Sequence, residues 1–339
     1  MEATNTLESG KSVKRWLLIA VRVVVSTILL AWVLSRANLR EVLAAAAGAQ
    51  LPLLLFAYAL NFVGVLITAV RWRGLLEAHG VNAPMGFLVR SVLVGVFFNN
   101  FLPSTVGGDA MRAYDLYRLA QRSAPMTSVV VDRLLGLIVL TLFALVSLPF
   151  ASQLTSRTPG LSLLVVGGGA GLLIVAWSIF SAGSFGILLR MLSKLPAGLS
   201  APAGRLFGGF GAYRGQTAAL VRGFGWSFLL QSNVILYYVV IARAFGYDIP
   251  VIDFFLMVPL VLYVMMVPIT VNGIGLRENV FALFFAAYGI GNSGAVAFAW
   301  LAYFGGLLYG ILGAAVYALR RVDPALEPVT PPVGPGVDG

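Results

Sequence analysis

The sequence predicts an all-α polytopic membrane protein of about eight transmembrane helices, with further broken or re-entrant helices, an inverted-repeat architecture and both termini in the cytoplasm. Three observations predict this class. Of the 339 residues, 59% are hydrophobic and 11% are charged, whereas soluble domains carry about 25% charged residues. Several apolar runs reach the length of about 20 residues that crosses a bilayer. One motif that contains proline, glycine and arginine occurs twice.

The apolar runs define one membrane domain between two short ends. The strong candidates for spanning helices are residues 16–34, 51–70, 126–150, 160–181, 223–245 and 295–319. Two further blocks, 84–119 and 252–291, are ambiguous because proline and glycine interrupt their apolar pattern. We therefore expect a cytoplasmic N-terminal segment (1–15), a single transmembrane domain (16–321) and a disordered cytoplasmic tail (322–339).

The start of the chain is predicted to be a retained first helix. Lys11, Lys14 and Arg15 precede the first apolar run, as in a signal peptide. However, the run is too long for a signal peptide, and no small-residue cleavage site follows it. The Ala-rich stretch 38–49 predicts a short helix at the membrane interface.

The basic residues set the predicted orientation. Lysines and arginines cluster in short loops beside the apolar runs, which is the positive-inside pattern. Arg71-Trp72-Arg73 is interpreted as the cytoplasmic end of a helix, with Trp72 in the aromatic belt. In this orientation the basic residues that give the net charge of +10 face anionic lipid headgroups on the cytoplasmic side. No nucleic-acid partner is therefore expected.

The repeated motif is the most informative feature of the chain. Residues 103–112, PSTVGGDAMR, return 165 positions later as residues 268–277, PITVNGIGLR. Paired segments interrupted by proline or glycine in two halves of a chain point to the binding site of a transporter. Three predicted spans separate the copies, and an odd number inverts the second block relative to the first. Whether each block crosses the membrane or re-enters stays open.

The two motif arginines, Arg112 and Arg277, are the first candidates for substrate contact. Arginine at membrane depth is costly and usually marks a pathway or a ligand. Its planar donor fork suits a phosphate. Snorkelling to an interface is the alternative, as is a local ion pair with Asp109 or Glu278.

The remaining motif residues are proline, threonine, glycine and asparagine. Free amides and hydroxyls at a broken helix can bind an anion, but the same residues also serve helix breaking and close packing. These candidates are Pro103, Thr105, Gly108, Thr270 and Gly273. Asn99, Asn100 and Asn272 are strongly polar for this depth, so they could satisfy the broken backbone or touch a headgroup.

Asp132 and Arg133 lie inside the apolar run 126–150. An acidic residue near a helix N-terminus is favourable by itself. Because Asp132 comes more than a turn into the run, we expect a buried ion pair between Asp132 and either Arg112 or Arg133.

No catalytic, metal or cofactor site is predicted. The chain has no cysteine and a single histidine, His79, in a polar loop. This excludes thiolate chemistry and histidine-based metal sites. The sequence also contains no P-loop, no Gly-x-Ser-x-Gly motif and no cluster of metal ligands. We therefore expect a protein that is not an enzyme and has no cofactor.

Four segments together resemble one known family. RWRGLLEAHG, FFNNFLPSTVGGDAMRAYDLYR, SVVVDRLLGL and PITVNGIGLRENVFALFFAAYGI resemble the transmembrane domain of lysylphosphatidylglycerol synthases. Stand-alone relatives are called flippase-like or UPF0104 membrane proteins. In full-length members a cytosolic domain aminoacylates phosphatidylglycerol, and the membrane domain translocates the product. Because no such domain follows the last helix of this chain, the resemblance implies lipid translocation without lysyl transfer.

The resemblance covers residues 12–321 and also implies a set of pathway residues by motif position. They are Asn100, Pro103, Asp109, Arg112, Asp132, Arg133, Arg277 and Glu278.

The resulting hypothesis is a multi-pass plasma (inner) membrane protein that moves a lipid headgroup between leaflets. The lipid is an anionic or aminoacylated phospholipid, or a polyprenyl-linked lipid. Two alternatives stay open: an ion-coupled small-solute secondary transporter, and a membrane-embedded transferase acting on polyprenyl phosphate lipids. Expected partners are phosphatidylglycerol-type or polyprenyl phosphate-linked lipids. Both a homo-oligomer and a partner enzyme of lipid synthesis are compatible with the sequence.

Overall fold

The described part of the chain consists mainly of helices joined by short turns and loops. The computed structural model describes residues 38–101, 107–120, 127–158, 160–180, 210–213, 215–267 and 269–319, with isolated positions 24, 27, 28 and 31. The predicted segments 1–15 and 322–339 lie outside the described residues, as does the predicted span 16–34 apart from those isolated positions. Across the described ranges no strand occurs, which confirms the predicted all-α class.

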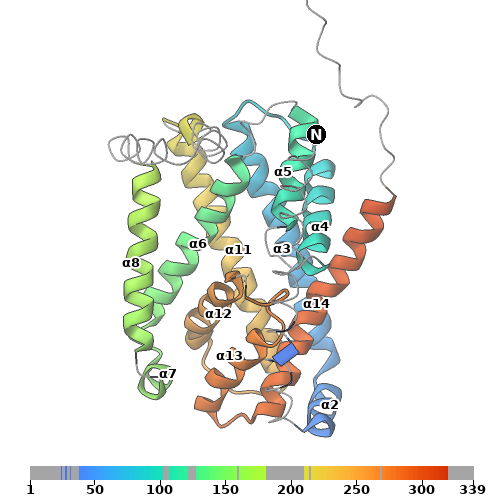
Figure 1. Cartoon of the computed structure of the whole chain (residues 1–339), viewed down its shortest axis with the longest axis vertical. Coiled ribbons are helices and arrows are strands. Elements are labelled where there is room, and N and C mark those ends of the chain that lie inside the picture. Colours follow the sequence, from blue (N-terminus) through green and yellow to red (C-terminus); the bar gives the residue numbers. More distant parts are fainter. Residues whose placement is uncertain are drawn as a thin grey trace, which may run out of the picture.

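Four helices are long and apolar enough to cross a membrane. They are α3 (Leu51–Glu77), α6 (Thr127–Ser147), α11 (Thr217–Ala244) and α14 (Asn292–Ala318). Even the 21 residues of α6, at about 1.5 Å per residue, extend over about 30 Å, the thickness of the hydrocarbon core. All four run between the two ends of the bundle in Figure 1. The spans predicted at 51–70 and 223–245 are longer in the structure.

Helices α3 and α11 form a closely packed antiparallel pair. The backbone N–H of Gln50 donates to the Ala244 carbonyl over 2.8 Å, and the Asn233 side chain donates to the Leu60 carbonyl over 2.9 Å. Gly64 lies at their contact, where a Cβ atom would come within 3.2 Å of the Asn233 amide nitrogen. A small residue at this position therefore allows the close approach.

The first ambiguous block forms an antiparallel hairpin of two short helices, α4 (Met85–Phe101) and α5 (Gly107–Ala120). Near its open end Ser91 donates to Asp115 over 2.7 Å. Near the other end the Gly108 N–H donates to the Asn99 side chain over 2.8 Å. Their 17 and 14 residues correspond to about 25 and 21 Å of helix. Both helices are therefore shorter than the spanning helices.

The second ambiguous block has the same form. It consists of α12 (Val251–Met266) and α13 (Leu276–Phe285), followed by the 3-10 turn η3 (Ala286–Tyr288). Tyr288 donates to Asp253 over 2.7 Å across the open end. In Figure 1 this hairpin lies in the half of the bundle where α3 begins, whereas α4 and α5 lie in the half where α3 ends.

The turn between α12 and α13 explains the glycines of the second motif. Asn272, Gly273 and Gly275 all have positive φ angles, of 49°, 73° and 81°. Glycine adopts this left-handed region without a steric penalty, and asparagine tolerates it better than most residues. The Glu278 carboxylate then accepts the Gly275 N–H over 2.7 Å, which caps the start of α13.

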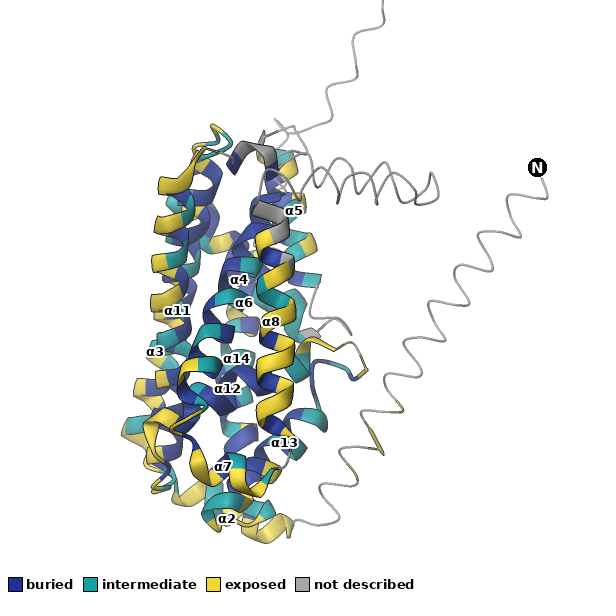
Figure 2. Ribbon diagram, turned by 90° about the vertical axis from the view of Figure 1, so that its left-hand side faces the viewer, coloured by how far each residue is buried: buried dark blue, intermediate teal, exposed yellow. Residues whose placement is uncertain are grey.

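The remaining helices lie at the periphery. The predicted Ala-rich helix is α2 (Leu39–Gly48), which Asn38 caps by accepting the Arg40 N–H over 3.0 Å. The apolar helix α8 (Leu161–Phe180) packs on α6 and exposes most of its outer face in Figure 2. Two short helices, α7 (Ser152–Arg157) and η2 (Phe210–Tyr213), lie in the connections.

Candidate functional site

The ends of the two hairpins meet inside the bundle. Asn272, in the α12–α13 turn, lies 3.4 Å from both the backbone and the side-chain oxygen of Asn100 at the end of α4. It also donates to the Tyr303 hydroxyl over 3.0 Å. Asn100 in turn donates to the Gly306 carbonyl of α14 over 2.7 Å. Three asparagine and tyrosine side chains thus link the two motif regions through α14.

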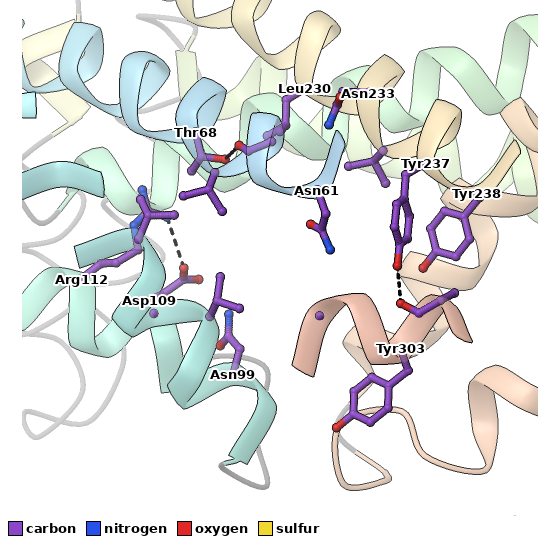
Figure 3. Close-up of a pocket in the computed structure, with 18 of the residues that line it drawn as sticks. Asn61, Thr68, Asn99, Asp109, Arg112, Leu230, Asn233, Tyr237, Tyr238 and Tyr303 are labelled. Carbon is purple, nitrogen blue, oxygen red and sulfur yellow. Dashed lines mark hydrogen bonds and ion pairs between the residues drawn. The ribbon is translucent and has the colours of Figure 1, made fainter. Parts of the chain in front are cut away.

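A cavity of about 400 Å³ lies beside this junction, and side chains from both motifs line it. Arg112 of α5 and Arg277 of α13 both line it, together with residues of α3, α4, α11 and α14. Gly64 and Leu230, at the middle of α3 and α11, form part of its wall. Figure 3 shows the labelled polar side chains arranged around this space. The cavity therefore lies midway along α3 and α11, two of the three spanning helices that border it.

Arg112 is held by carboxylates and by an aromatic face. Its terminal nitrogens donate to Asp132 over 3.2 and 3.3 Å, and one of them lies 3.6 Å from Asp109. The guanidinium carbon lies 4.3 Å from the ring centre of Trp72, which is cation–π distance. The residue is 6% exposed, and its buried Nε has no hydrogen-bond partner among the described residues.

Arg277 repeats this arrangement in the second hairpin. It donates to the adjacent Glu278 over 2.7 Å, and its guanidinium carbon lies 4.3 Å from the ring centre of Tyr303. It is 3% exposed, and its buried Nε also lacks a partner among the described residues. Each motif arginine therefore has a carboxylate, an aromatic face and an unsatisfied donor. Buried donors of this kind are rare and require an explanation, such as a bound water or ion.

The first arginine belongs to a larger buried cluster of charges. Asp132 lies between Arg112 and Arg71, and Arg71 donates to the Asp132 carboxylate over 2.6 Å. Asp109 likewise pairs with both Arg112 and Arg133. Among the described residues of this cluster, two carboxylates thus face three guanidinium groups, an excess of one positive charge. Such an excess at membrane depth is costly unless an anion or water balances it.

Another cavity, of about 260 Å³, also borders this cluster. Its polar lining consists of Arg71, Asp132, Arg133 and Gln231, and its apolar lining comes from α6 and the end of α12. The charged cluster therefore borders both cavities.

The interpretation of Arg71-Trp72-Arg73 as a belt at a helix end is wrong for the first two residues. Trp72 is fully buried and Arg71 is 5% exposed. Arg71 also donates to Ser227 of α11 over 2.9 Å. Helix α3 continues for more than a turn beyond its apolar run, and Asp132 from α6 neutralises the buried Arg71. Arg73 does lie at the surface, where it pairs with Glu77 over 3.5 Å.

The other candidate residues have several distinct positions. Asn99 and Asp109 line the larger cavity, and Asp132 and Arg133 line the smaller one. Gly108 serves close packing, because a Cβ atom there would clash with the Gly95 carbonyl and the Asn99 side chain. Thr270 is buried and lines neither of these cavities. Pro103 and Thr105 lie outside the described residues.

Several cavity residues were not among the sequence candidates. They are uncharged polar side chains of the spanning helices, namely Asn61, Thr68, Asn233, Tyr237 and Tyr303. Asn61 and Asn233 could have been noticed as amides inside apolar runs, but nothing in the sequence indicates that they face one cavity. Within the described residues no three histidine, cysteine or acidic side chains gather as a metal site.

Comparison with known proteins is decisive for the family. The family model described as the lysylphosphatidylglycerol synthase TM region matches residues 19–313, most of the chain. The chain belongs to this family. A UPF0104 membrane protein of Pyrococcus horikoshii is 26% identical over 166 residues, which is 48% of this chain and 47% of that protein. Another, of Methanocaldococcus jannaschii, is 32% identical over 94 residues, 27% of this chain and 28% of that protein.

These matches cover about half of the first relative and less than a third of the second. Membership of the lysylphosphatidylglycerol synthase TM family, together with the apolar helices, identifies an integral membrane protein with a role connected to membrane lipids.

Proposed function

We propose that this protein moves the headgroup of a membrane lipid between the two leaflets while the acyl chains stay in the bilayer. One observation carries the proposal. Arg112 and Arg277, from the two copies of the motif, line the same cavity midway along α3 and α11. A lipid headgroup that crosses a bilayer needs a polar environment at this depth, because unpaired polar groups are costly in hydrocarbon.

The chemistry of the cavity supports an anionic headgroup. A guanidinium presents a planar set of donors that matches the oxygens of a phosphate. The charged cluster around Arg112 has one positive charge in excess. A phosphate between Arg112 and Arg277 would balance this charge and give the two arginines further acceptors.

The arrangement of the hairpins supports access from both sides. We infer that α4–α5 and α12–α13 form an inverted pair, with each hairpin entering from its own end of the bundle towards the shared cavity (Figure 1). In transporters with inverted repeats, rocking or gating of such elements around a fixed central site exposes the site to each side in turn. With both termini in the cytoplasm, the α4–α5 hairpin would enter from the cytoplasmic side of the plasma membrane.

The test is lipid exchange between leaflets in vesicles that contain the purified protein. Fluorescent phosphatidylglycerol and a labelled polyprenyl phosphate are the two substrates, and a membrane-impermeant quencher reports the outer leaflet. The wild-type protein should exchange at least one of them faster than protein-free vesicles do. Loss of a charged hydrogen bond costs about 1.5–3 kcal/mol, so Arg112→Ala and Arg277→Ala should each slow exchange about 10- to 150-fold.

Matched variants separate this effect from misfolding. Arg243→Ala removes a half-exposed arginine whose partner Asp248 lies at the surface, and it should leave exchange unchanged. Arg112→Lys and Arg277→Lys keep the charge but remove the planar fork, so folded protein with reduced exchange is expected. If the wild type moves neither lipid, or if the alanine variants exchange like the wild type, the proposed function is wrong. A small-solute transporter would then explain the cavity better.

A further inference from the structure

The smaller cavity, of about 260 Å³, contains hydrogen-bond donors that the proposed lipid pathway does not use. Its polar side chains come from three spanning helices: Arg71 of α3, Asp132 and Arg133 of α6, and Gln231 of α11. Apolar side chains of α6 and α12 form the rest of its wall. The Arg133 side chain is 33% exposed, so this cavity is not sealed from its surroundings.

Gln231 is a buried amide without a partner. The residue is 9% exposed, and its side chain makes no hydrogen bond with any described residue. Buried polar side chains nearly always have a partner, either in the protein or in a bound molecule. Because an unpaired amide is costly to bury, Gln231 indicates that the cavity holds a ligand.

A second donor lies close to this amide. Arg71 donates from Nε to Asp132 over 2.6 Å and from one terminal nitrogen to Ser227 over 2.9 Å. Its other terminal nitrogen has no partner in the described ranges. Gly136 keeps the space between the two side chains open, because a Cβ atom there would lie 3.0 Å from the Gln231 amide nitrogen and 3.7 Å from a terminal nitrogen of Arg71.

The charges around this position favour an anion with a single negative charge. Of the described residues in the charged cluster, three are arginines and two are aspartates. Asp132, the carboxylate that lines the cavity, is already occupied, because one oxygen accepts from Arg71 and the other from Arg112. A monovalent anion would balance the excess charge. A divalent anion would leave a negative charge in a partly apolar site, which is costly.

We infer that the smaller cavity is a binding site for a small monovalent inorganic anion, of which chloride is the commonest example. The Gln231 amide and the unpaired terminal nitrogen of Arg71 donate to the anion, which lies beside the backbone of Gly136. None of the residues that line this cavity lines the larger one. The inference therefore goes beyond the proposed function and does not depend on which lipid the protein moves.

The direct test is the chlorine NMR line width of chloride in the presence of the purified full-length protein. An uncharged detergent is used, with gluconate as the balancing anion. Chloride that exchanges with a site on the protein gives a broadened line, and bromide should abolish this broadening whereas sulfate at equal ionic strength should not. Gln231→Leu removes the amide, and Gly136→Ala fills the space beside it. Each should weaken chloride binding about tenfold or more, the loss expected for a hydrogen bond to a charged group.

Thermal unfolding separates loss of binding from misfolding. An anion that binds only the folded protein raises the Tm, so the Tm of the wild type should rise with chloride at constant ionic strength and then level off. Gln231→Leu should unfold in gluconate at no lower temperature than the wild type, because its amide has no partner to lose, but it should not show the rise. Gln153→Leu, on the surface of α7, is the matched control and should keep both the rise and the line broadening.

Three results would overturn the inference. The first is a wild-type line no broader than that of the Gln231→Leu protein. The second is competition by sulfate as strong as that by bromide. The third is a Tm that rises with phosphatidylglycerol but not with chloride, which would assign the cavity to a lipid phosphate instead. None of these measurements uses lipid exchange, so this inference and the proposed function can fail separately.

Discussion

Asp132→Asn removes the carboxylate that Arg71 and Arg112 share. Asp132 is 2% exposed and accepts hydrogen bonds of 2.6 Å from Arg71 and of 3.2 and 3.3 Å from Arg112. An asparagine has the same shape, so no cavity forms. The substitution instead leaves two buried guanidinium groups without their common counter-charge.

The expected loss follows from this geometry. Removing one partner of a buried ion pair costs about 3–5 kcal/mol, because the remaining charge is left unpaired. On the scale of about 2–4 °C per kcal/mol for soluble domains of 150–250 residues, the Tm should fall by about 6–20 °C. Arg71→Met combined with Asp132→Asn removes one charge of each sign, so the net charge of the cluster is preserved. The double variant should therefore be more stable than Asp132→Asn alone.

The assay is thermal unfolding of the purified protein in detergent, followed by intrinsic fluorescence. The exposed pair of Arg243 and Asp248 gives the control, since Asp248→Asn should cost less than about 1 kcal/mol. An Asp132→Asn protein with the Tm of the wild type would refute the electrostatic account of the cluster. A double variant whose Tm falls by the sum of the two single losses would refute the pairing of Arg71 with Asp132.

Two further predictions concern packing and pH. Gly108→Ala should lower the free energy of unfolding by about 1–3 kcal/mol, because its Cβ atom would clash with the Gly95 carbonyl. Gly74→Ala is the control and should cause no such loss, because there is open space around Gly74. Equal Tm values for the two variants would contradict this prediction. Burial lowers the pKa of His79, whose Nε2 has no hydrogen-bond partner among the described residues. Below about pH 6.5 the unfolded chain therefore binds more protons than the folded one, so the Tm should fall with falling pH. His79→Gln should show a smaller slope, and an identical slope would count against the assignment.

The helical class was predictable from the composition, and the interruption of two helical blocks was predictable from the prolines and glycines of the repeat. Proline and glycine inside an apolar run interrupt a helix whatever the tertiary structure. The blocks 84–119 and 252–291 could therefore be recognised as interrupted from the sequence alone. The sequence did not distinguish crossing from re-entry, because that depends on which helices lie beside each block. The hydrogen bonds from Gly108 to Asn99 and from Tyr288 to Asp253 reveal two antiparallel hairpins.

The failures have a common physical origin. Arg71 looked like a residue at a helix end, because a sequence-local view contains no counter-charge for it. Its partner Asp132 lies 61 positions later on another helix. Asn61 and Asn233 were not among the predicted site residues, for the same reason. Only the packing of α3 against α11 brings them to one cavity, and the periodicity of either helix alone does not specify its neighbour.

The central claim is that a lipid headgroup occupies the cavity between the two hairpins. The chain has no native cysteine, so Thr68→Cys places one thiol in the cavity wall. Leu66→Cys places a control thiol on the exposed side of the same helix. In nanodiscs, a membrane-impermeant thiol reagent should label the Thr68→Cys protein, because thiolates form in water-accessible sites, and it should not label the Leu66→Cys protein. In separate experiments, replacing phosphatidylcholine by phosphatidylglycerol and adding a polyprenyl phosphate should slow the labelling of the cavity thiol, in at least one case about tenfold. Labelling of the Thr68→Cys protein that is absent, or that neither lipid slows, would contradict the account.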